Sequence, residues 1–222
     1  MEPNKPFSTL QLYPVYQPIV DRQLSIVGYE SFIRGTDANR VLADFLSPSL
    51  QRLDRIVAMD TLCKQLALEK YTGAAPLFLN SHPYSSNPFL QPLSLPKRHG
   101  LVIELNEHAL VNEEQLLLKN VEWLSASGVS FAIDDFGCGF LSFPFIMRLN
   151  PGFIKLAKEV IQSCSDMRSR EVVKRIVQPF RDMGIQIIAE GIESEAQYES
   201  LQSVVDAFQG YWISKPKILL GA

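Results

Sequence analysis

The sequence predicts an α/β fold and, within that class, a closed (β/α) barrel. Short apolar runs without polar alternation recur along the chain, as expected of parallel strands that are buried on both faces. The segments between these runs place apolar residues at the spacing of amphipathic helices. An open doubly wound sheet has the same alternation of strands and helices, so the number of strands must decide between the two folds.

Eight strands are expected, which is enough to close a barrel in a chain of 222 residues. Their expected ranges are residues 14–20, 25–33, 76–80, 101–104, 130–134, 152–156, 185–190 and 206–213. Only residues 21–24 separate the first two strands, whereas a parallel crossover needs roughly a dozen residues. The first two strands should therefore form a hairpin, and one strand should run antiparallel to the rest.

Three of the intervening segments have apolar residues at helical spacing. These residues are Ile56, Met59, Cys63 and Leu66 in the first segment, Leu116, Val121 and Leu124 in the second, and Val172, Val173, Ile176, Val177 and Phe180 in the third. Each segment should lay its apolar stripe on the sheet. Trp123, Trp212 and most of the phenylalanines are expected in the core.

The composition is typical of one soluble cytoplasmic domain over residues 1–222, with residues 1–10 as a possible tail. The chain is 46% hydrophobic with a net charge of −3, so it can bury a full core and has no basic surface that would indicate DNA or RNA binding. Cys63, Cys138 and Cys164 are too scattered for a disulfide framework or a zinc site. No apolar run approaches the ~18 residues of a membrane span, and no signal peptide is visible.

The pair Asp134-Asp135 directly follows an apolar run and is the most informative feature of the chain. Two adjacent carboxylates repel each other, so either a divalent cation holds both, or one caps a helix while the other is solvated. Three other apolar runs also end in a polar residue, which is Asn80, Glu104 or Glu190. This recurrence favours the metal, because carboxylate and amide oxygens would converge at the carboxyl ends of the strands.

These residues belong to a series of motifs that resembles the EAL family, whose members hydrolyse cyclic di-GMP. The motifs are YQPIV (16–20), VGYESFIR (27–34), Asn80, ELNE (104–107), DDFG (134–137), Lys155, AEGIE (189–193) and QGY (209–211). They occur in order from about Tyr16 to Pro216, so the resemblance covers nearly the whole chain.

The resemblance implies a single EAL-type domain folded as a modified triosephosphate-isomerase-type (β/α)8 barrel. Two Mg²⁺ or Mn²⁺ ions would bind the substrate phosphate, and a water between them would attack phosphorus to give the linear dinucleotide pGpG. Such a protein would lower the level of cyclic di-GMP, a bacterial second messenger, and would act as a homodimer.

The resemblance also implies roles for individual residues. Glu30, Asn80, Glu104 and Asp134 would bind one metal ion, and Asp134 would bridge to a second ion that Asp135 and Glu190 hold directly or through water. Lys155 would orient the nucleophilic water, with Glu190 beside it, and Glu107 would steady the loop after Asp135. Arg34 would contact a substrate phosphate, and Gln17 and Gln209 would line the substrate site.

The charges of these residues support a metal site independently of the resemblance. Glu30, Glu104, Asp134, Asp135 and Glu190 together carry −5, and Lys155 returns +1, which leaves −4. At an effective dielectric constant of 20, each like-charge contact at 4 Å costs about 4 kcal/mol. The carboxylates must therefore take up protons or bind cations, and two divalent ions would cancel the charge.

Some of these residues also have simpler explanations. Lys155 could be a lysine that extends to solvent from a strand end, Arg34 a solvated residue after a strand, and Gln209 part of a turn before Gly210. The order of the motifs favours the functional roles.

The chain departs from the family pattern at three places. The signature tripeptide is Glu30-Ser31-Phe32, the loop after the paired aspartates has Cys138, Phe140 and Leu141 where Thr, Tyr and Ser are usual, and Ala157 replaces an Asp. Phe140 could approach the site. Two classes of function therefore remain: an active phosphodiesterase, and a weak or inactive domain that acts as a cyclic di-GMP receptor or protein-interaction module. The enzyme is favoured because all five carboxylates are present.

Overall fold

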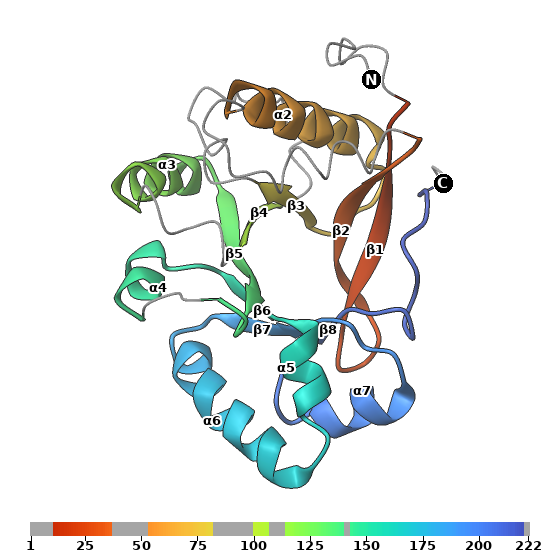
Figure 1. Ribbon diagram of the computed structural model, residues 1–222, viewed down its shortest axis with the longest axis vertical. Helices are drawn as coiled ribbons and strands as arrows, with labels where there is room; N and C mark the ends of the chain where they lie inside the picture. Colours follow the sequence, from red (N-terminus) through yellow and green to blue (C-terminus); the bar gives the residue numbers. More distant parts are fainter. Residues whose placement is uncertain (1–10, 37–52, 82–99, 107–113, 140–142, 220–222) are drawn as a thin grey trace.

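A computed structural model describes residues 11–36, 53–81, 100–106, 114–139 and 143–219, and its strands form a closed barrel (Figure 1). The strands are β1 (Tyr13–Asp21), β2 (Ile26–Arg34), β3 (Leu77–Ser81), β4 (Leu101–Asn106), β5 (Val129–Phe136), β6 (Phe153–Leu156), β7 (Gln186–Ala189) and β8 (Ala207–Phe208). The helices are α2 (Leu53–Lys70), α3 (Glu114–Ala126), α4 (Phe143–Leu149), α5 (Lys158–Ser163), α6 (Met167–Asp182) and α7 (Glu195–Leu201). The predicted barrel is confirmed, and an open sheet is excluded.

β1 is the antiparallel strand of the barrel, as the short hairpin connection predicts. It pairs antiparallel with both β2 and β8, whereas the other neighbouring strands pair in parallel. The Asp21 carboxylate accepts hydrogen bonds from the backbone amides of Gln23 and Ser25 and so stabilises the turn. The carboxyl-terminal segment runs beside β1 (Figure 1), where Lys217 exchanges two backbone hydrogen bonds with Tyr16.

The barrel interior contains an apolar layer with one residue from each strand. Its members are Ile19, Gly28, Phe78, Val102, Ala132, Phe153, Ile188 and Ala207. A Cβ atom at Gly28 would lie 2.7 Å from the Phe78 ring, so this position is a glycine because the ring fills its space. The Phe78 and Phe153 rings meet edge to face, with centroids 5.0 Å apart. This layer closes the interior below the carboxyl ends of the parallel strands.

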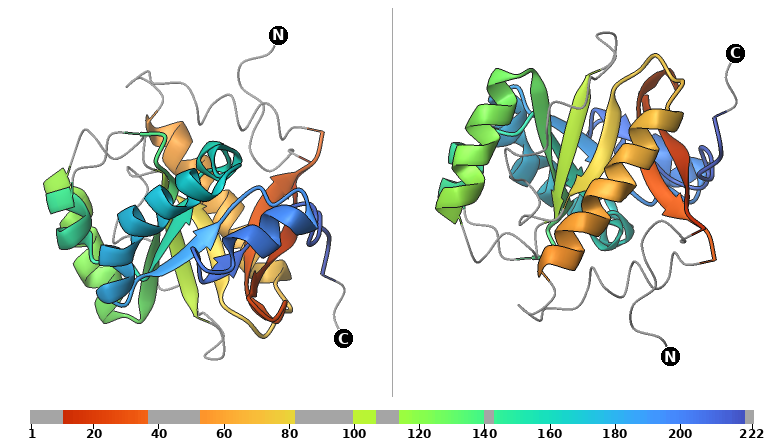
Figure 2. Two further views of the ribbon diagram at one scale, coloured as in Figure 1. Left: turned by 90° about the horizontal axis from the view of Figure 1, so that it is seen from below. Right: turned by 90° about the horizontal axis from the view of Figure 1, so that it is seen from above.

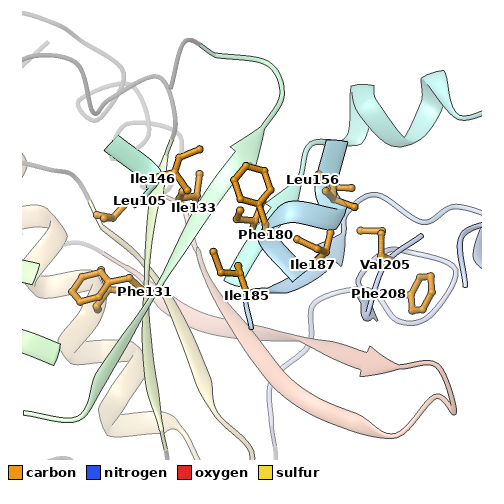
Figure 3. Packing of buried hydrophobic residues seen from close by; sticks show 14 of the residues in the cluster. Leu105, Phe131, Ile133, Ile146, Leu156, Phe180, Ile185, Ile187, Val205 and Phe208 are labelled. Carbon is orange, nitrogen blue, oxygen red and sulfur yellow. The ribbon is translucent and has the colours of Figure 1, made fainter. Parts of the chain in front are cut away.

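A second core lies between the outer faces of the strands and the helices, which wrap around the barrel (Figure 2). Figure 3 shows part of it, in which Phe180 of α6 packs near Leu156 and Ile187 of neighbouring strands. Strand residues that point outward therefore pack against helices, while the alternate residues face the barrel interior. Among the helices in the described ranges, none is long and apolar enough to span a bilayer.

Two expectations about the helices are wrong in part. Val173, Val177 and Phe180 are buried as expected, but Val172 and Ile176 are 51% and 48% exposed. A helix packed on one side buries a limited stripe, and these two residues lie one position, about 100°, away from it. Trp123 is 45% exposed on α3, so it is not a core residue, whereas the Trp212 ring packs against the core.

The last strand is also shorter than predicted. It was expected over residues 206–213, but β8 ends at Phe208. The reason is Gly210, where a Cβ atom would lie 2.1 Å from the backbone oxygen of Ile192. The chain turns at this close approach, which leaves Gln209 at the mouth of the barrel.

Candidate functional site

A layer of polar side chains lies directly above the apolar layer of the barrel interior. Each member is two residues away from the apolar residue of the same strand: Gln17, Glu30, Asn80, Glu104, Asp134, Lys155, Glu190 and Gln209. Because strand side chains alternate with a period of two, the two layers face the same interior. All eight residues are among those expected at the site from the sequence.

Lys155 lies at the centre of this layer and is 1% exposed. Its Nζ atom is 2.9 Å from Glu30 Oε2 and 2.6 Å from Glu104 Oε1. The same atom is 3.0 Å from Asp134 Oδ1 and 2.5 Å from Glu190 Oε1. One ammonium group is thus shared by four carboxylates that come from four different strands or the residues directly after them.

This arrangement changes the protonation equilibria of the site. Burial lowers the pKa of Lys155, but the surrounding carboxylates, Asp134 most strongly, more than offset burial and raise it well above its usual value. Burial, followed by repulsion from Glu30, raises the pKa of Glu104 well above the usual range. Burial raises the pKa of Glu190 from 4.5 to about 8, despite the opposing attraction of Lys155. One lysine therefore does not suffice to keep all the acids ionised.

Several oxygens at this centre are suited to a metal ion. Neither carboxylate oxygen of Glu104, nor Oδ1 of Asp134, accepts a hydrogen bond of normal geometry from the residues that the structure describes, although all are buried and two of them lie close to Lys155 Nζ. Asp134, Asp135 and Glu190 each offer an oxygen, and these atoms lie within 4.8 Å of one another. Buried carboxylate oxygens that converge from several strands and are not saturated by hydrogen bonds form a ligand set for a hard divalent cation.

A β-bulge brings the two neighbouring aspartates to the same centre. Between Ile133 and Phe136, β5 has one residue more than its partner β6, and Asp135 has a left-handed backbone with φ of 56°. In a regular strand Asp135 would point away from Asp134, but here its carboxylate joins the cluster. Asn106 holds it there by donating a 2.7 Å hydrogen bond from Nδ2 to Asp135 Oδ2. Asn106 follows Glu104 at the spacing of one strand face, but it was not among the residues expected at the site from the sequence.

Amide side chains surround Glu30. Asn80 Nδ2 donates to Glu30 Oε1 at 2.8 Å, and Gln209 Nε2 donates to Glu30 Oε2 at 2.7 Å. Gln209 Nε2 also donates to Gln17 Oε1 at 3.1 Å, and Gln17 donates in turn to the backbone oxygen of Ser214. These bonds fix Glu30 in one orientation and tie the two ends of the described chain to the site.

The polar layer opens into a cavity of about 760 Å³ that is large enough for a dinucleotide. Arg34 is exposed at its rim, and its guanidinium carbon lies 5.5 Å from the centre of the Phe32 ring. Lys158 and Tyr211 also line the cavity and were not identified from the sequence. Glu107, expected to steady the loop after Asp135, lies outside the described residues, as do Phe140, Leu141 and the possible tail at residues 1–10.

The remaining departures from the family pattern lie in different environments. Ser31 is buried and Phe32 is half-buried, and both line the cavity. Cys138 is exposed, with Sγ 3.6 Å from Glu159 Oε2. Ala157 is completely buried immediately before α5.

Comparison with known proteins agrees with this geometry. The family model described as EAL domain matches residues 4–216. The probable cyclic di-GMP phosphodiesterase PdeN of Escherichia coli strain K12 is 28% identical over 226 residues, which cover 93% of this chain and 43% of PdeN. The chain spans less than half the length of the curated relatives it matches.

Solved structures have the same fold. The PaMucR phosphodiesterase in complex with c-di-GMP is 25% identical with a TM-score of 0.74, over 93% of this chain and 92% of that one. Klebsiella pneumoniae BlrP1, in a complex with manganese and cyclic di-GMP, is 23% identical with a TM-score of 0.76, over 97% of this chain and 57% of that one.

The raised pKa of Glu190 predicts that the metal-free protein loses stability as the pH rises. Between pH 4.5 and about 8, the folded protein keeps a proton on Glu190 that the unfolded chain releases. The unfolded state therefore binds fewer protons in this window, and the free energy of unfolding falls as the pH increases. Glu190→Gln removes this titration, so its melting temperature in chelator should fall less than that of the wild type between about pH 5 and 8.5.

Differential scanning fluorimetry in EDTA measures this difference. Glu199→Gln is the matched control, because Glu199 is exposed on α7, and it should keep the wild-type pH dependence. Parallel pH curves for Glu190→Gln and the wild type would contradict the prediction.

Proposed function

The chain belongs to the EAL domain family, and we propose that it hydrolyses cyclic di-GMP to linear pGpG with the help of two divalent metal ions. The observation that supports this proposal best is the convergence of Glu30, Glu104, Asp134 and Glu190 on one lysine, with Asp135 beside them. Five carboxylates at the mouth of a barrel are a costly arrangement unless cations bind there. PdeN and the PaMucR phosphodiesterase, which the chain resembles, support the choice of substrate.

The metal ligands would divide between two sites. Glu30, Asn80, Glu104 and Asp134 would hold one ion, and Asp134, Asp135 and Glu190 would hold the other, directly or through water. Mg²⁺ or Mn²⁺ would lower the pKa of bound water toward roughly 7 and stabilise charge on the attacking and leaving oxygens. Their four positive charges would match the excess negative charge of the site.

The other residues would bind and orient the reactants. Hydrolysis forms one bond from a water oxygen to phosphorus and breaks the bond from phosphorus to a sugar 3′ oxygen, which leaves as a hydroxyl after taking up a proton. Lys155, an ammonium group at the centre of the layer, would hold the attacking water by a hydrogen bond. Arg34 at the rim would contact a phosphate, and Gln17 and Gln209 would contact the nucleotide beside Glu30. The role of Glu107 in steadying the loop after Asp135 remains a prediction.

The proposed activity predicts that purified protein converts cyclic di-GMP to pGpG when Mg²⁺ or Mn²⁺ is present. Glu30→Gln keeps the size of the side chain but removes one charged ligand, and it should lower kcat by about 100-fold or more. Ca²⁺ tolerates looser geometry, so it should bind with little or no turnover. Chromatography of the nucleotides measures each rate, and Glu69→Gln on the exposed face of α2 is the control.

Two results would contradict this proposal in different ways. If the metal-loaded wild type binds cyclic di-GMP but leaves it intact over hours, the chain is a receptor. The altered loop at Cys138 and the replacement at Ala157 would then explain the loss of activity. If Glu30→Gln retains most of the activity, the metal lies elsewhere.

Ala157 affects the helix that follows the site. It is the N-cap residue of α5, and its methyl group cannot accept a hydrogen bond from the first turn. Its own backbone N–H donates to the Phe136 oxygen at 3.2 Å, so the cap lies beside the strand that contains Asp134 and Asp135. The Asp that the family has here would therefore cap α5 and add a negative charge near the cluster.

Substitution of Ala157 separates these two effects. Ala157→Asn and Ala157→Asp should both stabilise the protein by about 1 kcal/mol, a rise in melting temperature of about 2–4 °C, because either side chain can cap α5. Only Ala157→Asp should also lower the Mn²⁺ concentration needed for half-maximal rate. Metal titrations and melting curves of both variants test this, and a lower melting temperature for both would show that the buried side chains remain unpaired.

A homodimer is the assembly that the surface supports. Phe143 and Met147 of α4 are 59% and 54% exposed, and the Phe143 ring stacks on Phe180 of α6 with centroids 5.6 Å apart. Helix α6 adds the exposed residues Val172 and Ile176, and α3, α4 and α6 lie along one side of the barrel (Figure 1). Exposed large apolar side chains on neighbouring helices are typical of an interface between subunits.

Charge at this surface should therefore separate the subunits. Met147→Glu is expected to shift the protein from dimer to monomer in analytical ultracentrifugation, because each interface would bury two unpaired carboxylates. Ile26→Glu is the control. Ile26 is also apolar and 49% exposed, but it lies at the start of β2, in the hairpin with β1. A wild type that sediments as a monomer at micromolar concentration would contradict the proposed dimer.

A further inference from the structure

A buried ion pair on α2 lies beside the end of β3, outside the carboxylate cluster. Asp60 and Lys64 are one helical turn apart on α2 and are 1% and 3% exposed. Lys64 Nζ contacts Asp60 Oδ2 and donates a 2.6 Å hydrogen bond to Ser81 Oγ. Both charged residues also line the cavity that the polar layer opens into.

Stability alone does not account for this pair. Removing two charges from water costs several kcal/mol per ion, and apolar residues of similar size are often as good or better for folding. What a buried, hydrogen-bonded ion pair does provide is a fixed geometry between the elements that it joins. Here the ion pair lies within α2, and the hydrogen bond from Lys64 Nζ to Ser81 Oγ joins this helix to the last residue of β3.

The carboxyl end of β3 has backbone pairing only on the β4 side. The ladder between β2 and β3 ends at the pair Ser31 and Leu79, whereas the ladder between β3 and β4 continues through Asn80 and Ser81. On the β2 side, side-chain hydrogen bonds replace the backbone ladder after its last pair. Asn80 Nδ2 donates to Glu30, and the next residue, Ser81, accepts from Lys64.

We propose that Lys64 is a positioning residue for the metal site. Held by Asp60, its ammonium fixes Ser81, and through the backbone of β3 it fixes the adjacent Asn80 amide relative to Glu30. This inference rests on the proposed function, because Asn80 is placed there among the metal ligands. Groups that orient metal ligands from outside the ligand set typically change metal affinity by 10–100-fold when they are removed.

Ser81→Ala is the mildest substitution that tests the proposal, because it removes the hydrogen bond from Lys64 and leaves the ion pair with Asp60 intact. Isothermal titration calorimetry with Mn²⁺ alone, at a temperature where the protein is folded, should give a Kd about 10-fold higher than that of the wild type. Ser81→Thr keeps the hydroxyl group and should restore the wild-type Kd. Thr61→Val is the matched control, because the Thr61 hydroxyl on the same helix donates to the backbone oxygen of Val57.

A second variant tests the ion pair itself. The double substitution Asp60→Leu with Lys64→Met removes both charges, so no unpaired charge is left buried. We expect its Mn²⁺ Kd to rise about 10-fold, while its melting temperature in EDTA stays the same or increases. A purely structural role would instead lower the melting temperature and leave the Kd unchanged.

The outcomes separate this proposal from the one on which it rests. If the wild type binds Mn²⁺ and both Ser81→Ala and the double variant bind it within about twofold of the wild-type Kd, Lys64 does not position the site, and the proposed function stands. If the wild type shows no Mn²⁺ binding, the metal site and the positioning role are both overturned.

Discussion

The alternation of side chains along a β-strand is the constraint on which this site depends. Every strand of the barrel contributes one residue to the apolar layer and, two positions away, one residue to the polar layer above it. A shift of one residue in any strand would move its polar residue to the helix-covered face. Phe78 and Phe153 fill the interior below the polar layer, and Gly28 leaves the space for Phe78. The packing of the apolar layer therefore fixes the height at which Asn80 and Lys155 enter the barrel.

The polar layer is more acidic than one lysine can neutralise. Lys155 contacts four carboxylates, and Asp135 adds a fifth nearby. Burial keeps protons on part of this set near neutral pH, as the raised pKa of Glu190 indicates. Divalent cations would replace these protons, since they supply two charges each and accept several oxygens at once. Metal binding would therefore be coupled to proton release and to the stability of the barrel mouth.

The sequence predicted the eight-stranded barrel, the hairpin that makes β1 antiparallel and, from apolar runs that end in polar residues, Asn80, Glu104, Asp134 and Glu190 of the polar layer. Its other four members, Gln17, Glu30, Lys155 and Gln209, were implied by the resemblance to the EAL family. The sequence could not predict features that depend on contacts distant in sequence. The bulge that turns Asp135 toward Asp134 depends on the register of β5 against β6, and β8 stops where Gly210 meets the backbone of Ile192. The role of Asn106 could not be predicted from the sequence, because it depends on a hydrogen-bond partner that only the structure identifies. The exposure of Ile176 depends on where neighbouring elements leave part of α6 uncovered.

The two buried lysines differ in a way that charge balance explains. Lys155 is outnumbered by carboxylates, whereas Lys64 faces Asp60 in a pair whose formal charges cancel. An excess of acid attracts cations, but a neutral pair has no reason to exchange its lysine for a metal ion. The Asp60 side chain already contacts an ammonium group, although it lines the same cavity as the acidic layer. A lysine that is paired within its own helix, next to an acidic layer that would bind metal, can hold a neighbouring strand in position without competing for those ions.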